Sequence, residues 1–289
     1  MANPPIQALT TTQLPRYTEP FDWGRIQADI HSTGGVILEQ LYETEQVSRL
    51  NQEMDTYIEQ NLQAGNPHSG SPQYDRFLGA RTIRLQGLIN KSAEAARWIG
   101  NPALLSWANE SLAPLATSIL LNAAELIQIG PGEPAQYLHR DSDSWPAAAI
   151  QEDPFVVNSL VALDEFTLEN GATWVVPGSW AWPRDRRAEE NEYVRAEMLP
   201  GDCLLFRGDI LHRGGANLTD KPRRGISITY CAGWLRPVEN SVFNIPVAKV
   251  RCLSTQMQEL LGFHAYDGSA HNGGMLGLYE NGNPDVLLQ

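Results

Sequence analysis

The stretch Gln136-Tyr137-Leu138-His139-Arg140-Asp141 organises the rest of the chain, together with the distant His212. Residues i and i+2 of a β-strand point to the same face, so a strand here would project His139 and Asp141 together. His212 follows the strand-like run 203–206. Two histidines and one carboxylate are the ligand set of the facial triad that binds non-haem Fe(II). The alternative is an ordinary strand with one solvated acid and one hydrogen-bonded histidine.

The composition is that of a folded protein, and the net charge excludes some classes of binding partner. The 289 residues suffice for a large core, and 42% hydrophobic with 19% charged residues are globular values. The net charge of −13 argues against nucleic acid or an anionic membrane as a partner, because both require a basic surface. We see no membrane-length apolar run, no signal-peptide pattern and no paired cysteine spacing. We therefore expect a cytoplasmic protein with no nucleic-acid or membrane partner.

The chain reads as one domain with a helical part and a strand-rich part. Residues 1–20 are rich in Pro and Thr and predict a flexible arm, and helical periodicity dominates from about 21 to 115. From 117 to about 236, short apolar runs between Gly, Pro, Asn and Asp predict an antiparallel sandwich or barrel. A helix and a Gly-rich tail fill residues 237–289. The sequence thus predicts a mainly β fold with flanking helices.

Several further blocks carry a resemblance to a known family. In chain order they are Gln136 to Asp141, Glu169-Asn170-Gly171-Ala172-Thr173, Val176-Pro177-Gly178-Ser179, Leu199-Pro200-Gly201-Asp202, His212, and Asn217-Leu218-Thr219-Asp220-Lys221-Pro222-Arg223-Arg224. Across about residues 30–265 the chain resembles the phytanoyl-CoA dioxygenase family of Fe(II)/2-oxoglutarate-dependent oxygenases, in particular the fungal branch that tailors terpenoid and alkaloid natural products. The resemblance implies a double-stranded β-helix, the jelly-roll core of cupin-like proteins. It also implies that His139, Asp141 and His212 bind the iron.

Three of these blocks also read as turns. Glu169-Asn170-Gly171, Pro177-Gly178-Ser179 and Pro200-Gly201-Asp202 have turn-forming residues, and we expect them to shape loops and to take no part in the chemistry. Thr173 is the exception, because the matching residue in related enzymes contacts the cosubstrate; ordinary strand packing is its alternative. Many relatives have a histidine where this chain has Trp180. We expect Trp145 and Trp174, and either Trp180 or Trp182, to form walls of the substrate pocket; ordinary core packing is the alternative for these aromatics.

The resemblance implies that 2-oxoglutarate chelates the iron and that its far carboxylate needs a cation. Fe(II) carries two positive charges, whereas the ligand carboxylate and 2-oxoglutarate together carry three negative charges. A guanidinium would supply the missing charge with bidentate geometry, and Arg223 lies eleven residues after His212, the family's spacing for this arginine. On one strand, Arg224 would face the opposite way. Gln136 and Arg84 also resemble cosubstrate contacts; Gln136 requires a bend in the chain, and Arg84 has a surface ion pair as its alternative.

The sequence thus predicts an Fe(II)/2-oxoglutarate-dependent dioxygenase of secondary metabolism. With O2 it would oxidise an unactivated C–H of a bulky, largely apolar natural product, by hydroxylation, desaturation, rearrangement, epoxidation or endoperoxidation. We expect a terpenoid or meroterpenoid substrate, and the resemblance leaves a homodimer open. The polar, Gly-rich segments 65–79 and 262–283 are candidate lids, with simple disorder as the alternative. Two alternatives remain: a non-catalytic jelly-roll protein that binds a small molecule, and a cupin-type metal isomerase or hydrolase that needs no O2.

Overall fold

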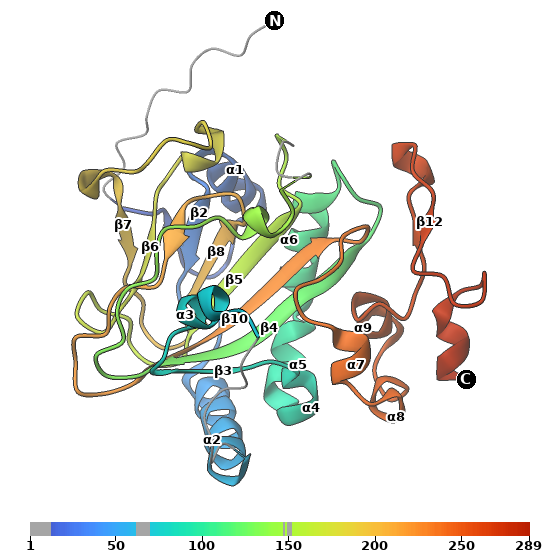
Figure 1. The fold of residues 1–289 in the computed structure, drawn as a ribbon, viewed down its shortest axis with the longest axis horizontal. Helices are drawn as coiled ribbons and strands as arrows, with labels where there is room; N and C mark the ends of the chain where they lie inside the picture. Colours follow the sequence, from blue (N-terminus) through green and yellow to red (C-terminus); the bar gives the residue numbers. More distant parts are fainter. Residues whose placement is uncertain (1–12, 62–69, 147, 149–151) are drawn as a thin grey trace, which may run out of the picture.

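A seven-stranded sheet is the scaffold of the molecule, with the strand order β1-β2-β8-β5-β10-β4-β3 (Figure 1). Its strands are β1 (Arg16–Tyr17), β2 (Gly35–Leu38), β3 (Thr82–Leu85), β4 (Ile119–Ile129), β5 (Val156–Ala162), β8 (Cys203–Arg207) and β10 (Arg223–Ala232). Neighbouring strands are antiparallel except β1 and β2, which are parallel. The structure is a computed structural model that describes residues 13–61, 70–146, 148 and 152–289.

A smaller sheet of order β7-β6-β9 packs against one face of the large sheet. It contains β6 (Thr173–Val175), β7 (Val194–Ala196) and β9 (His212–Arg213). Leu160 and Phe206 of the large sheet share a buried cluster with Val175 and Val194 of the small one. Two sheets packed face to face in this way form the jelly-roll core that the sequence predicts.

Helices cover the opposite face of the large sheet (Figure 1). They are α1 (Trp23–Thr33), α2 (Thr44–Asn61), α4 (Leu88–Lys91), α5 (Ala93–Ile99) and α6 (Pro102–Leu112). The start of α6 follows from its sequence, because the Asn101 side chain accepts hydrogen bonds from the N–H groups of Ala103 and Leu104 and Pro102 occupies the first turn. The helices bury their apolar stripes against the outer side chains of the sheet.

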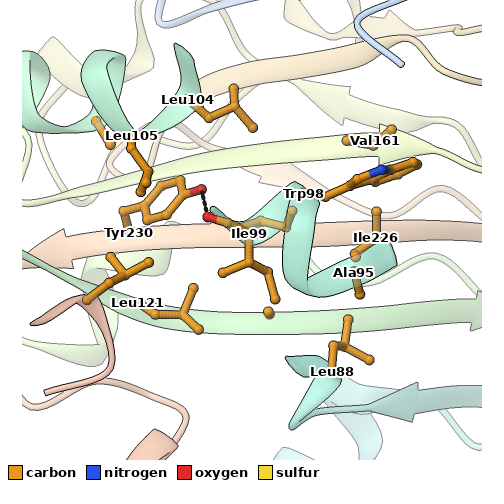
Figure 2. Close-up of a cluster of buried hydrophobic side chains, with 14 of the residues drawn as sticks. Leu88, Ala95, Trp98, Ile99, Leu104, Leu105, Leu121, Val161, Ile226 and Tyr230 are labelled. Carbon is orange, nitrogen blue, oxygen red and sulfur yellow. Dashed lines mark hydrogen bonds between the residues drawn. The ribbon is translucent and has the colours of Figure 1, made fainter. Parts of the chain in front are cut away.

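The core between helices and sheet is dense and mostly aliphatic. Figure 2 shows Trp98 and Ile99 of α5, with Leu104 and Leu105 of α6, packed on residues of β4, β5 and β10. The Tyr230 hydroxyl donates a hydrogen bond to the carbonyl of Ile99 at 2.9 Å, so the polar atom of this buried phenol is satisfied. This layer holds the sheet rigid behind the site.

Several elements differ from the sequence prediction. The apolar runs 118–121 and 125–129 belong to one strand, β4, which keeps its pairing with β10 through a bulge between Thr229 and Tyr230. Strand β3 comes from the segment where helical periodicity dominates, yet it joins the large sheet; β2 contains the strand-like run Val36-Ile37-Leu38 and agrees with its sequence. The predicted arm contains strand β1; its residues 1–12 lie outside the described part of the chain.

The two candidate lid segments have more structure than expected. Within 65–79 the chain forms helix α3 (Pro72–Leu78), with Ser71 as its N-cap and Pro72 in its first turn; residues 65–69 are outside the described part. In 262–283 the chain forms the short hairpin of β11 (Tyr266–Asp267) and β12 (Met275–Leu276), whereas α7 (Ser241–Asn244), α8 (Val247–Val250) and α9 (Thr255–Leu260) precede that segment. No helix of the described chain is both long and apolar enough to cross a membrane.

Tyr230→Phe tests the buried hydrogen bond behind the sheet. The change leaves the Ile99 carbonyl without this donor, and we expect a loss of about 1–3 kcal/mol in the free energy of unfolding. Urea denaturation followed by circular dichroism measures it. Tyr279→Phe, at a 43% exposed position, is the control and should change stability by less than about 0.5 kcal/mol. Equal free energies of unfolding for the two variants would contradict a stabilising role of the Tyr230–Ile99 hydrogen bond.

Candidate active site

A cavity of about 460 Å³ opens on the inner face of the large sheet. Its walls come from β3, β4 and β10, from α3, and from the segment that carries the first histidine. Every site residue predicted from the sequence lines this one cavity: Arg84, Gln136, His139, Asp141, Thr173, His212 and Arg223.

Three of these side chains converge as a metal centre requires. His139 Nε2 lies 3.7 Å from Asp141 Oδ1, and His212 Nε2 lies 3.7 Å from Asp141 Oδ2. One ligand atom from each of the three residues lies within 4.8 Å of the other two. The two histidines are also joined through the backbone, since each donates its N–H to the other's carbonyl at 3.0 Å.

The local backbone around His139 is not the predicted strand. His139 forms an isolated bridge with His212, and Asp141 begins a 3-10 helix, η1 (Asp141–Ser144). Arg140 between them is buried and donates to the carbonyls of Asp209 and Ser179, both at 3.0 Å. The histidine and the carboxylate therefore meet through a turn anchored by Arg140. The strand prediction is wrong, although the two side chains do come together.

The protonation of the imidazoles suits a metal. The Nδ1 atoms of His139 and His212 face the carbonyls of Tyr137 and Ile210 at 3.0 and 3.1 Å. A carbonyl only accepts, so each Nδ1 carries the hydrogen and each Nε2 presents its lone pair to the shared centre. Burial, and next the neighbouring His212, lower the pKa of His139 to about 4, which keeps this ring neutral near pH 7. The donor set thus fits Fe(II) bound by the Nε2 atoms of two imidazoles and one carboxylate.

Arg223 is a buried cation facing the same cavity. Its guanidinium lies 3.9 Å over the Phe166 ring, and its Nη2 donates to the carbonyl of Gly171. No carboxylate in the described part of the chain forms an ion pair with it, and its Nε has no hydrogen-bond partner there. Burial, reinforced by the charge of Arg84, lowers the pKa of Arg223 to about 9, so the group stays charged at neutral pH. A buried charge of this kind requires an anionic partner.

The block Glu169-Asn170-Gly171 forms a turn, as predicted, and this turn also positions a hydrogen-bond acceptor for Arg223. Gly171 has a φ of +91°, and a Cβ at this position would lie 2.7 Å from the carbonyl oxygen of Gly215. Only glycine fits without strain. The turn thereby places the carbonyl that accepts the hydrogen bond from Arg223.

Of the remaining predicted residues, Gln136 and Arg84 already have hydrogen-bond or ion-pair partners within the protein. Gln136 donates through Nε2 to the carbonyl of Phe77 at 3.1 Å and accepts from the N–H of Gly214 at 3.0 Å. Thr173 is buried at the cavity wall. Arg84 donates to the Leu78 carbonyl at 3.0 Å and pairs with Glu125. The ion pair considered for Arg84 is therefore present, but both partners are mostly buried and it does not lie on the surface.

Several residues of the cavity escaped the sequence prediction. Glu125 on β4 lines the wall, and the amide of Asn158 on β5 donates to Asp141 Oδ2 at 2.8 Å. Phe77 lies edge-on to the His139 ring with 4.8 Å between centroids, and Tyr74 and Tyr137 line the cavity beside it. The Ser71-Pro72 pair was a readable helix-start signal for α3, and the polar Asn158 inside an apolar run was a readable signal in β5.

The predicted tryptophan walls are wrong. The cavity lining contains none of Trp145, Trp174, Trp180 and Trp182. Trp174 stacks between Arg195 and Arg213, and Trp180 packs under Arg207 at 4.3 Å. None of the described residues after Val238 lines the cavity either, so the C-terminal segment covers no part of it in this structure.

Comparison with known proteins settles the family. Residues 30–225 match the phytanoyl-CoA dioxygenase (PhyH) family. The chain belongs to this family. It is 33% identical to dioxygenase ALT11 of Alternaria alternata over 264 residues, covering 89% of this chain and 85% of that protein. It is 31% identical to the iron/alpha-ketoglutarate-dependent dioxygenase penM of Penicillium thymicola over 271 residues, covering 91% and 85%.

Solved structures support the same fold. The non-haem alpha-ketoglutarate-dependent epimerase SnoN from nogalamycin biosynthesis aligns with a TM-score of 0.59 at 20% identity, covering 74% of this chain and 82% of that one. Family membership and the converging His139, Asp141 and His212 make this phytanoyl-CoA dioxygenase family member an iron- and 2-oxoglutarate-dependent dioxygenase.

Metal binding should stabilise the folded protein through the three converging residues. Anaerobic Fe(II) at 100 times its dissociation constant should raise the free energy of unfolding by about 2.7 kcal/mol. Asp141→Ala removes the only acidic ligand and should abolish most of that gain. A thermal scan with and without Fe(II) measures the effect. Asp267→Ala, an acid outside the cavity, is the control, and an equal loss in both variants would contradict the metal site.

Proposed function

We propose that His139, Asp141 and His212 hold the iron and that Arg223 binds the far carboxylate of 2-oxoglutarate. The observation that carries this proposal is the buried Arg223, charged and without a carboxylate partner in the described chain, in the same cavity as the three converging residues. With Asp141, 2-oxoglutarate and Fe(II) in place, Arg223 brings the net charge of the cluster to zero. Thr173 and Gln136 are proposed to contact the cosubstrate from the wall, and Arg84 from the side of β3.

The chain's own residues prepare the site for this chemistry. Iron, when bound, would activate O2, and 2-oxoglutarate would supply two of the electrons that reduce O2, the substrate supplying the others. The two Nδ1–H···O=C bonds fix the tautomers and orient the rings toward one point. Phe77 and Tyr137 pack beside His139 and limit the access of water from that side.

We further propose that the substrate is a natural product with a large apolar part, and that the enzyme oxidises one of its unactivated C–H bonds in secondary metabolism. Phe77, Ile127 and Leu160 give the cavity apolar walls, and its volume falls in the range of small-molecule sites, about 300–1,000 Å³. A terpenoid or meroterpenoid skeleton would use these walls. The Arg84–Glu125 pair adds a polar section that favours a substrate with at least one polar group.

The proposal includes a homodimer. Apolar side chains are exposed on and after the β11–β12 hairpin, with Met275, Leu276, Leu278 and Tyr279 each at least 43% exposed. Burial of such side chains favours association between copies. Size-exclusion chromatography with light scattering would detect a dimer, and a monomer at micromolar concentration would contradict it.

A turnover assay tests the function directly. The purified enzyme with Fe(II), 2-oxoglutarate and O2 is incubated with a panel of fungal terpenoid and alkaloid intermediates, and products and succinate are measured by mass spectrometry. The mass change separates hydroxylation from desaturation and endoperoxidation. Conversion that persists without O2 and 2-oxoglutarate would instead support a metal isomerase or hydrolase. Binding of a panel member without any succinate release would support a non-catalytic binding protein.

Two adjacent arginines allow a matched test of the cosubstrate site. Arg223 faces the cavity, whereas Arg224 on the same strand pairs with Asp55 at 2.7 Å and with Gln128. Arg223→Ala leaves a buried carboxylate without its cation, a loss of about 3–5 kcal/mol. We therefore expect the half-saturating concentration of 2-oxoglutarate, measured by succinate formation, to rise about 100-fold or more. Arg224→Ala should leave it within about threefold, because Arg224 does not line the cavity and its side chain projects to the other face of β10, toward Asp55 and Gln128. The opposite ranking would refute the assignment.

A further inference from the structure

Asn158 is a polar residue at a position where the fold favours an apolar one. It lies in β5, a strand whose seven residues are all buried, and its own exposed fraction is 0%. Its Nδ2 donates to Asp141 Oδ2 at 2.8 Å. Its Oδ1 is buried and has no hydrogen-bond partner in the described structure. The side chain therefore serves Asp141 and leaves its other polar atom unsatisfied.

This arrangement lowers the stability of the fold. A buried acceptor without a partner costs about 1–3 kcal/mol, and leucine, which has nearly the same shape, would remove that loss. The orientation of the amide is not open, because a carboxylate only accepts and the NH2 group must face it. A residue that lowers stability while bonding one oxygen of a metal-binding carboxylate points to a role in the site.

The distances to the histidines do not select which oxygen of Asp141 meets the iron. Oδ1 lies 3.7 Å from His139 Nε2, and Oδ2 lies 3.7 Å from His212 Nε2. The hydrogen bond does distinguish them, because Oδ2 has a donor and Oδ1 has none. No other residue of the described chain donates to this carboxylate.

We infer that Asn158 holds Asp141 as a one-oxygen ligand and so keeps a coordination position free for O2. The inference rests on the proposed iron site. Three protein ligands leave three positions of a six-coordinate iron, of which chelating 2-oxoglutarate takes two and O2 takes one. A carboxylate that binds through both oxygens would fill the last position. With Oδ2 held by Asn158, the carboxylate is restrained from turning its second oxygen toward the metal. Asn158 is thus a positioning residue that acts through Asp141.

Asn158→Leu tests this inference with a readout other than turnover. Nitric oxide is used as a probe for the O2 position of the anaerobic complex with Fe(II) and 2-oxoglutarate, and the adduct is quantified by electron paramagnetic resonance. We expect the variant to keep its Fe(II) and to bind nitric oxide about 10–100-fold more weakly than the wild type, the usual size of an outer-shell effect. Its melting temperature without metal should equal or exceed that of the wild type, because the unsatisfied Oδ1 is gone.

Ser159→Ala is the matched control on the same strand. Ser159 is fully buried and donates to the Ile228 carbonyl at 2.8 Å, and as the next residue of β5 it projects to the opposite face. This variant should lose thermal stability and keep the nitric oxide affinity of the wild type. If Asn158→Leu does not fold, Asn158→Ala removes the same donor without adding bulk, and its adduct is judged in the same way.

Three results would overturn the inference. Nitric oxide affinity equal to the wild type would show that Asn158 does not keep the position open. Loss of Fe(II) itself would show that Asn158 is needed to place the carboxylate at all, and not to limit it to one oxygen. A wild type that binds no Fe(II) would refute the proposed function itself. This result is separate from the other two because it is seen in the wild type, without any variant.

Discussion

The reciprocal hydrogen bonds between the backbones of His139 and His212 are the constraint on which the site depends. The two residues are 73 positions apart, and each donates its N–H to the other's carbonyl. Because His212 also pairs with Val175 in the small sheet, the segment of His139 becomes a further edge of that sheet. The two imidazoles therefore project side by side from adjacent backbone segments, and their ring centroids lie 4.3 Å apart. Arg140, next to His139, also fixes this segment by donating hydrogen bonds to the carbonyls of Asp209 and Ser179.

A second constraint is electrostatic. The interior of the sandwich contains Arg223, a charge that the described protein does not neutralise, held by a glycine turn and an aromatic ring. Folding must tolerate this cation without its partner, at a cost in the stability of the protein. The anion that completes the site should therefore also stabilise the protein.

The sequence was most informative where a residue type has a single physical use. Asn101 with Pro102 set the start of α6, and Gly171 set a turn that no other residue can form. It was least informative where tertiary contacts decide. The H-x-D stretch alternates like a strand, yet hydrogen bonds from Arg140 and the bridge to His212 turn it into η1. The tryptophans near the site in sequence were no guide to its walls, because Trp174 and Trp180 stack on arginines outside it. Asn158 stood out as a polar residue in an apolar run, but its role and that of Glu125 depend on partners distant in sequence.

The alternation along β4 has a consequence for how such an enzyme diverges. Ala123, Glu125 and Ile127 face the cavity, whereas Ala124 and Leu126 between them belong to the core against the helices. Alternate residues of β4 therefore contribute to different properties: those facing the helices to stability, and those facing the cavity to the shape of the substrate site. Substitutions on the cavity side leave the core packing and the iron ligands untouched, so new substrates become accessible by single steps that each preserve a folded, metal-binding protein.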